Sequence, residues 1–228
     1  MTIDQIHERF LHFYDKQSNY SAPEITAEEI DIYLNREQDD FLDELMSRGL
    51  EKNGEYLDYT KNITISYNTS VFATGTKTNS YLVALPANYR SSLLEELTIN
   101  YTDCNGITVS NRVAVIPITR DEYNEMVIDP FNKPWKEEVK RLTQSGGFFE
   151  LILTTGILPV TYYLDYIKIP NKMQYGSQYS TPVGDVDCEL DEKAQNIIID
   201  KAVIRALKTL GDPRIQLENI EKSIKTIK

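Results

Sequence analysis

The chain has 228 residues, of which 41% are hydrophobic, and its formal net charge is −11. The length supports a buried core, in one domain with appendages or in two small ones. The excess of acid disfavours a protein that wraps or reads nucleic acid, because such binding replaces phosphate counterions with Lys and Arg.

Two cysteines, Cys104 and Cys188, are too few for a disulfide framework and fit a reducing cytosol. The polar N-terminus is no signal peptide, no apolar run approaches the ~20 residues of a membrane span, and no membrane association is expected.

The charge is distributed unevenly along the chain. Residues 1–60 hold 15 acids against 5 Lys and Arg, whereas residues 201–228 hold 3 acids against 7 Lys and Arg. Either these are solvated helix faces, or the acidic end of one subunit meets the basic end of the next.

Two helices are predicted at the N-terminal end. Their starts are marked by capping boxes, in which Thr2 and Thr26 are each followed three residues later by Gln5 and Glu29. Apolar residues continue at helical spacing to about residue 18 in the first helix and to about Ser47 in the second. We therefore expect an N-terminal helical hairpin over residues 1–50.

The middle of the chain, residues 51–170, has the pattern of strands. They are predicted over residues 62–67, 81–85, 97–104, 107–116, 148–155 and 160–169. Asn105-Gly106 is a strong hairpin signal, and residues 69–80 are interpreted as a mobile polar loop. The prediction is an α+β fold, with helical N- and C-terminal segments packed together and an inserted antiparallel β-domain.

Residues 171–228 are predicted to hold a long loop and two helices. The first helix runs from about residue 190 to 210, and its apolar band, which includes Ile197 and Ile204, is too wide for a helix covered on one side. It is either central in its own domain, with residues 1–50 and 188–210 forming one helical unit, or shared with a neighbour. The last helix is marginal alone and must dock. Its apolar stripe consists of Leu217, Ile220, Ile224 and Ile227.

The segment DEYNEMVIDPFNKPW, residues 121–135, combines acids, aromatics and two prolines. Because proline fixes φ and donates no hydrogen bond, we interpret the segment as an extended arm. Rigid aromatic side chains are frequent anchors of protein interfaces, so Phe131, Pro134 and Trp135 are candidate contact residues. The alternative is that they cover the core of their own domain.

No pattern with a local catalytic mechanism is present. His7 and His12 are five residues apart and diverge on a helix, which predicts surface residues instead of paired zinc ligands. Asp121, Glu125 and Asp129 leave a carbohydrate-cleaving dyad open, since such a dyad follows no local spacing rule. We expect a protein that is not an enzyme and holds neither metal nor cofactor.

Four stretches together resemble a known family: TAEEIDIYLNREQDDFLDEL, DEYNEMVIDPFNKPW, TYYLDYIKIPNKM and LDEKAQNIIIDKAVIRALKTLGDPRIQ. The resemblance is to head-to-tail connector proteins, the adaptor or ring proteins of short-tailed bacteriophages, and especially of crAss-like phages. It covers both helical ends and the last strands.

The resemblance implies a structural virion protein that is made in the host cytoplasm. Such connectors form homo-oligomeric rings, commonly of about twelve subunits, between the portal protein and adjacent tail or ring proteins, and DNA passes through without specific binding. Residues 190–210 would form the contact between subunits, residues 213–228 would reach a neighbouring ring or the portal, and residues 121–135 would be an arm between subunits. A tail-completion or baseplate module is the structural alternative. A carbohydrate-cleaving tail module and a nucleic-acid mimic are alternatives from other classes.

Overall fold

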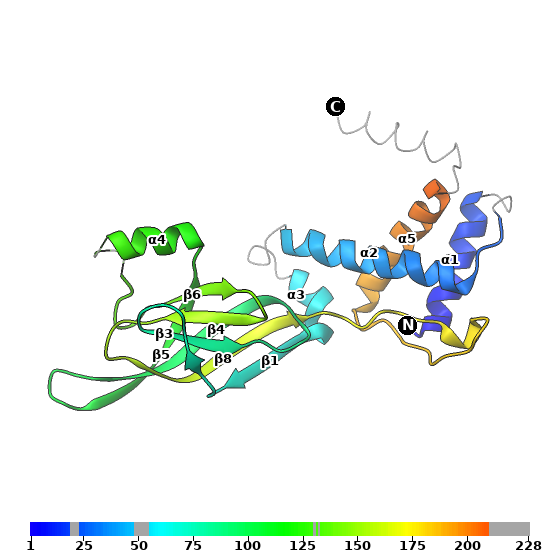
Figure 1. Cartoon of the computed structure of the whole chain (residues 1–228). Helices are drawn as coiled ribbons and strands as arrows, with labels where there is room; N and C mark the ends of the chain where they lie inside the picture. Colours follow the sequence, from blue (N-terminus) through cyan, green and yellow to red (C-terminus); the bar gives the residue numbers. More distant parts are fainter. Residues whose placement is uncertain (19–22, 48–54, 130, 132, 210–228) are drawn as a thin grey trace. The chain divides into compact units, whose positions relative to one another are not determined.

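The computed structural model describes residues 1–18, 23–47, 55–129, 131 and 133–209 (Figure 1). The chain divides into two compact units: a helical unit of residues 1–63 and 170–228, and a β unit of residues 64–169. Apart from one helix inside the β unit, helices and strands are segregated along the chain, and the predicted α+β class is confirmed. Among the described helices, none is long and apolar enough to cross a membrane.

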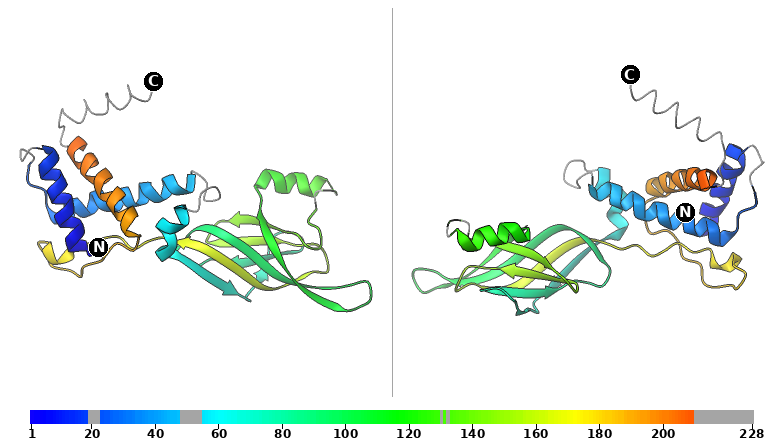
Figure 2. Two further views of the ribbon diagram at one scale, coloured as in Figure 1. Left: turned by 180° about the vertical axis from the view of Figure 1, so that it is seen from behind. Right: turned by 45° about the horizontal axis from the view of Figure 1, so that its top comes forward.

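Three long helices form the body of the helical unit (Figure 2). They are α1 (Ile3–Ser18), α2 (Ala27–Ser47) and α5 (Glu192–Thr209), accompanied by α3 (Glu55–Thr60), η1 (Lys61–Ile63) and η3 (Gly176–Gln178). Both predicted capping boxes form. Thr2 N–H donates to Gln5 Oε1 at 3.1 Å, and Thr26 N–H donates to Glu29 Oε2 at 2.9 Å.

Helix α5 is the central helix of this unit, because it packs against both α1 and α2. Its buried side chains are mostly small or branched, which permits close approach: Ala194, Ile198, Ile199, Ala202, Val203, Ala206 and Leu207. The wide apolar band is therefore largely covered within its own unit. Of the two alternatives left open by the sequence, the structure favours a helix central in its own unit.

Ion pairs join the acidic α2 to the more basic end of α5. The Arg205 guanidinium contacts Glu37 and lies 2.6 Å from Asp40 Oδ2, and Lys201 Nζ lies 2.6 Å from Glu44 Oε2. Part of the charge asymmetry along the sequence is therefore neutralised inside one chain.

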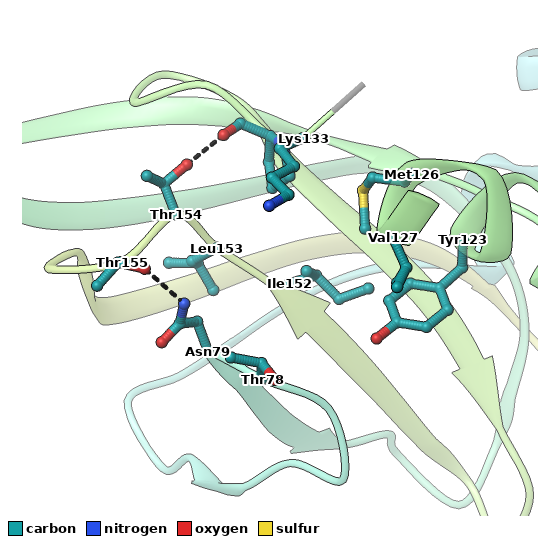
Figure 3. Close-up of a pocket in the computed structure, with 11 residues that line it drawn as sticks. Thr78, Asn79, Tyr123, Met126, Val127, Lys133, Ile152, Leu153, Thr154 and Thr155 are labelled. Carbon is teal, nitrogen blue, oxygen red and sulfur yellow. Dashed lines mark hydrogen bonds between the residues drawn. The ribbon is translucent and has the colours of Figure 1, made fainter. Parts of the chain in front are cut away.

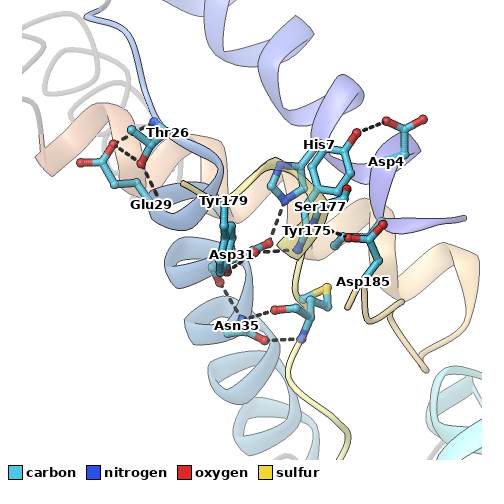
Figure 4. Close-up of polar contacts among 12 residues, drawn as sticks. Asp4, His7, Thr26, Glu29, Asp31, Asn35, Tyr175, Ser177, Tyr179 and Asp185 are labelled. Atoms are coloured by element: carbon cyan, nitrogen blue, oxygen red, sulfur yellow. Dashed lines mark hydrogen bonds and ion pairs between the residues drawn. The ribbon is translucent and has the colours of Figure 1, made fainter. Parts of the chain in front are cut away.

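Asp31 fixes the loop before α5 to the helices α1 and α2 (Figure 4). Its Oδ1 lies 2.7 Å from Nε2 of the buried His7, while its Oδ2 accepts from Tyr175 N–H at 2.8 Å and from the Tyr179 hydroxyl at 2.6 Å. His12 is exposed, as predicted, but the prediction of a surface position is wrong for His7. The reason is that His7 follows Ile6 on the buried side of α1, where Asp31 satisfies its ring nitrogen.

The β unit contains one sheet of eight strands in the order β1-β8-β4-β5-β6-β7-β3-β2. The strands are β1 (Thr64–Thr69), β2 (Ala73–Thr74), β3 (Ser80–Ala84), β4 (Tyr89–Thr102), β5 (Thr108–Pro117), β6 (Val139–Gln144), β7 (Phe148–Ile152) and β8 (Leu158–Lys168). Neighbouring strands are antiparallel, except that β5 and β6 are parallel. The expected antiparallel β-domain is therefore a mixed sheet. Parallel neighbours need a long crossover, which residues 118–138 supply.

The sheet curls around its own core. Strands β1 and β2 lie at opposite ends of the strand order, yet only residues 70–72 separate them in the chain. The core inside the curl comprises Val83, Leu97, Ile99, Val113, Val115, Val139, Phe149, Leu151, Leu153, Ile157, Tyr162, Leu164 and Tyr166. Within it Arg141 Nε donates to Glu95 Oε2 at 3.0 Å, and the Tyr162 hydroxyl donates to the same oxygen at 2.9 Å.

The loop of residues 75–80 is anchored by a buried carboxylate, which the interpretation as a mobile loop did not anticipate. Glu150, in β7, is fully buried. Its Oε1 accepts from Lys77 N–H at 2.8 Å and from the Ser80 hydroxyl at 2.7 Å, and its Oε2 accepts from the Thr76 hydroxyl at 3.0 Å. These bonds tie the loop to the sheet.

The prediction of an extended arm over residues 121–135 is wrong for its first half, which forms α4 (Arg120–Ile128). A capping box starts this helix: Thr119 Oγ1 accepts from Glu122 N–H at 3.2 Å, and Thr119 N–H donates to Glu122 Oε2 at 2.6 Å. The helix ends before Pro130. Asp129 is extended, with φ −96° and ψ 112°, as expected for a residue that precedes proline.

Candidate assembly interface

Several exposed apolar side chains of the β unit lie on α4 and the segment that follows it. Four side chains there are mostly exposed: Val127 (57%), Ile128 (83%), Phe131 (94%) and Trp135 (75%). We call these four residues the α4 surface. Exposed apolar residues are normal when scattered, but a cluster on one short stretch of chain is a common mark of a protein interface.

A groove of about 380 Å³ lies beside the α4 surface (Figure 3). Its apolar wall is formed by Met126 and Val127 from α4, Ile152 and Leu153 from the end of β7, and Pro134. Tyr123, Lys133, Thr78, Asn79, Thr154 and Thr155 form the remainder of its lining. A groove of this volume is large enough to bury a small ligand or several side chains of a partner.

Hydrogen bonds hold the walls of this groove. The Thr154 hydroxyl donates to the Pro134 carbonyl, and Asn79 Nδ2 donates to Thr155 Oγ1 at 2.8 Å. The Leu153 N–H donates to the Asn79 carbonyl at 3.0 Å, which Asn79 permits by adopting a φ of +54°. These hydrogen bonds between lining residues fix the shape of the groove.

The candidate contact residues have different surroundings. Phe131 and Trp135 project from the chain, whereas Pro134 is buried as part of the groove wall. Ile197 and Ile204 are half-buried on α5. The remaining candidates, Leu217, Ile220, Ile224 and Ile227, lie outside the described residues, so their role stays a prediction.

The acids of the carbohydrate-cleaving alternative are on or next to α4. Asp121 and Glu125 are exposed, and Asp129 Oδ1 accepts from Phe131 N–H at 2.9 Å. Beside them, hydrogen bonds from the Thr119 backbone and side chain lower the pKa of Glu122. A general acid in glycoside hydrolysis needs a raised pKa, so Glu122 is not suited to that role. Within the described residues no cluster of His, Cys, Asp and Glu is placed to hold a metal ion.

Sequence reasoning missed part of this exposed apolar surface. Val127 and Ile128 were not among the candidates, because an extended arm gave no reason to group them with Phe131. The available signal was MVI at the end of a short helix, next to Pro130, with Thr119 and Glu122 at capping-box spacing.

The model of the family described as phage tail ring protein 3/4 matches residues 1–212. The chain belongs to this family of phage tail ring proteins. The resemblance to crAss-like phage ring proteins is thereby confirmed. Among curated proteins, none matches the chain significantly.

As a phage tail ring protein, the molecule is a structural component of the virion. A ring subunit must offer surfaces to its neighbours, and in a cyclic ring each copy presents two different patches.

Proposed function

We propose that this ring protein forms a closed ring in the head-to-tail connector, between the portal protein and the tail. Copies would associate in the host cytoplasm during assembly. DNA would pass through the central channel during packaging and genome ejection. The proposal rests on the family membership, and the structural feature that supports it best is the α4 surface.

The α4 surface suits a contact between subunits because covering its exposed apolar side chains would release free energy. Phe131 and Trp135 are large, and both are exposed for most of their area in the isolated chain. Burial of apolar area stabilises a contact by about 25 cal/mol per Å², and aromatic residues are the usual anchors. Trp135 follows Pro134, whose fixed φ lowers the entropy lost on association.

The net charge of the ring would suit a channel for DNA. A ring of about twelve copies, each with a charge of −11, would carry about −132. Such a field repels the phosphate backbone and prevents adhesion. DNA would then transit without specific binding.

Removing the aromatic anchors tests the proposed ring contact. We expect the double variant Phe131→Ser, Trp135→Ser to fold like the unsubstituted chain, because both side chains are exposed, but to remain monomeric. Native mass spectrometry and negative-stain microscopy measure the ring. Val71→Ser is the matched control, since Val71 is also an exposed apolar residue of the β unit, away from α4. Normal rings from the double variant would contradict the contact.

Trp135 provides an independent readout, because it is the single tryptophan of the chain. Burial of Trp135 in a ring should shift its fluorescence to shorter wavelength as the protein concentration rises. The Phe131→Ser variant should move that transition to higher concentration. Cryo-microscopy of the intact particle then tests the location, and a ring found away from the portal vertex would contradict the connector role.

A further inference from the structure

We infer that the groove beside α4 receives the C-terminal segment of a second copy of this chain, residues 212–228. This inference rests on the proposed ring and names the two surfaces that meet in it. The groove, the acids around it and the composition of the segment each contribute to the argument.

The groove and the α4 surface form a continuous apolar seat. Val127 belongs to both, since it lines the groove and is 57% exposed. Met126, Ile152 and Leu153 line the groove together with Thr78, Asn79 and Thr154, which add hydroxyl and amide groups (Figure 3). A lining that is partly apolar and partly polar suits one face of an amphipathic segment.

Helix α4 adds negative charge along one side of this seat. Asp121, Glu122 and Glu125 are exposed on it, Asp129 follows it, and Arg120 supplies the single opposing charge within residues 120–129. Three cations also belong to this region: Lys133 lines the groove, Lys77 Nζ lies 5.2 Å from the centre of the Tyr123 ring, and Lys140 lies with Glu122 and Glu125 around a neighbouring hollow. The stretch 120–129 still has a formal charge of −3, so a cationic partner is favoured.

The C-terminal segment has the matching composition. Leu217, Ile220, Ile224 and Ile227 follow one another at intervals of three, four and three, which places them on one face of a helix. The last seven residues contain three lysines and no acid. The segment therefore offers an apolar stripe that ends in positive charge.

Ring symmetry decides in favour of a second copy as the occupant. In a head-to-tail ring every subunit carries two different patches. One patch binds the preceding copy, and the other, complementary patch binds the following copy. The α4 groove and the C-terminal segment are such a pair on one chain.

Photo-crosslinking of the full chain tests the inference. A benzophenone amino acid replaces Ile220, and copies with nitrogen-14 and nitrogen-15 are mixed before assembly and irradiation. We expect isotopically mixed cross-links between the C-terminal segment and residues 121–135 or 150–155. Cross-links that are only unmixed would mean that the segment folds onto its own chain, and cross-links to other regions would mean another site. Either result would overturn the inference.

Charge reversal provides the matched variants. Asp121→Lys with Glu125→Lys should lower the yield of mixed cross-links about fivefold, since exposed charge pairs contribute up to about 1 kcal/mol in total. Adding Lys222→Glu and Lys225→Glu in the same chain should restore the yield. The control is Glu8→Lys with Glu24→Lys, which makes the same charge change at exposed sites of the helical unit. An equal loss in the control, or a failure of the restoring changes, would contradict the pairing.

The two proposals fail in different ways. Ring assembly by native mass spectrometry, together with an absence of mixed cross-links to α4, overturns the present inference and leaves the proposed ring intact. Absence of rings from the unsubstituted chain overturns the proposed function, and this inference with it.

Discussion

At the scale of single residues, Asp31 collects three contacts from parts of the chain that are far apart. Its carboxylate is buried and pairs with His7 on α1 and with Tyr175 and Tyr179 in the loop before α5. A buried carboxylate is costly unless such partners satisfy it. The network therefore specifies how the loop lies on the helices.

Replacement of Asp31 by Ala should be far more damaging than removal of one partner. Asp31→Ala leaves the buried His7 and the part-buried Tyr175 N–H and Tyr179 hydroxyl without their acceptor, and we expect the free energy of unfolding to fall by about 3–5 kcal/mol. Tyr179→Phe removes one hydroxyl donor and should cost about 1 kcal/mol. Urea denaturation followed by circular dichroism measures both. Equal effects of the two variants would contradict a network centred on Asp31.

Glu150 gives the β unit a predictable response to acid. Burial alone would raise the pKa of Glu150, but the bonds from Ser80, Lys77 N–H, Thr76 and Gln144 outweigh it and lower the pKa. A carboxylate with a lowered pKa stabilises the fold at neutral pH, and this contribution is lost as the pH falls through that pKa, below the ordinary value of 4.5.

Glu150→Gln should therefore destabilise the protein by about 2 kcal/mol at pH 7, because the charged acceptor of the loop is gone. The difference from the unsubstituted chain should shrink below pH 4.5, where Glu150 itself becomes protonated. Thermal unfolding at a series of pH values measures this. A difference that is constant from pH 7 to pH 3 would contradict the assignment.

These residue networks were beyond prediction from the sequence. His7 and Asp31 are 24 residues apart, and Glu150 meets Lys77 across 73 residues. Their pairing depends on which helix faces and strand neighbours meet, and local periodicity carries no information about that. Glu150 lies between the core residues Phe149 and Leu151, so it faces the opposite side of β7, where the loop of residues 75–80 explains its burial.

At the scale of elements, sequence signals with a local mechanism predicted well. The capping boxes at Thr2 and Thr26 located α1 and α2, and Asn105-Gly106 located the β4–β5 hairpin, where Gly106 has a φ of +78°. β6 was missed because VKRLTQ is mostly polar. The signal that could have found it is Gly146-Gly147, whose positive φ angles form the turn between β6 and β7.

The cap of α4 should control the local stability of the α4 surface. Met126 is the only side chain of α4 that the structure describes as buried, so the helix depends strongly on its ends. Thr119→Ala should cost about 1 kcal/mol and raise amide hydrogen exchange in residues 123–128 about fivefold, with little change in global unfolding. Thr119→Ser retains the acceptor and is the control. Equal exchange in the Ala and Ser variants would contradict a role for the cap.

Removal of the C-terminal segment should affect association more than folding. A chain that ends at Gly211 keeps α1, α2 and α5 with their core, so we expect its unfolding free energy to change by less than about 0.5 kcal/mol. Its subunits should associate less, as measured by native mass spectrometry. The full-length variant Ile220→Ser, Ile224→Ser keeps the length and should behave in the same way. Unchanged assembly in both would contradict a docking role.

At the scale of the whole molecule, ion pairs inside one chain have a different role from charges that could act between chains. Arg205 and Lys201 already pair with acids of α2, so they are not the main source of attraction between copies. In the proposed ring, the exposed apolar side chains of the α4 surface would supply that attraction. The net charge of −11 on each chain would then act mainly on DNA in the proposed channel.

The assembled protein should therefore fail to retain duplex DNA at physiological salt. A protein that binds DNA through its backbone releases counterions, and its affinity falls steeply as salt rises. A ring of chains with a charge of −11 has no excess of cations for this exchange, so we expect no shifted band at any salt concentration in an electrophoretic mobility assay. A basic DNA-binding protein serves as the positive control. A shifted band that weakens with salt would show a cationic surface in the ring and would contradict a channel that repels its DNA.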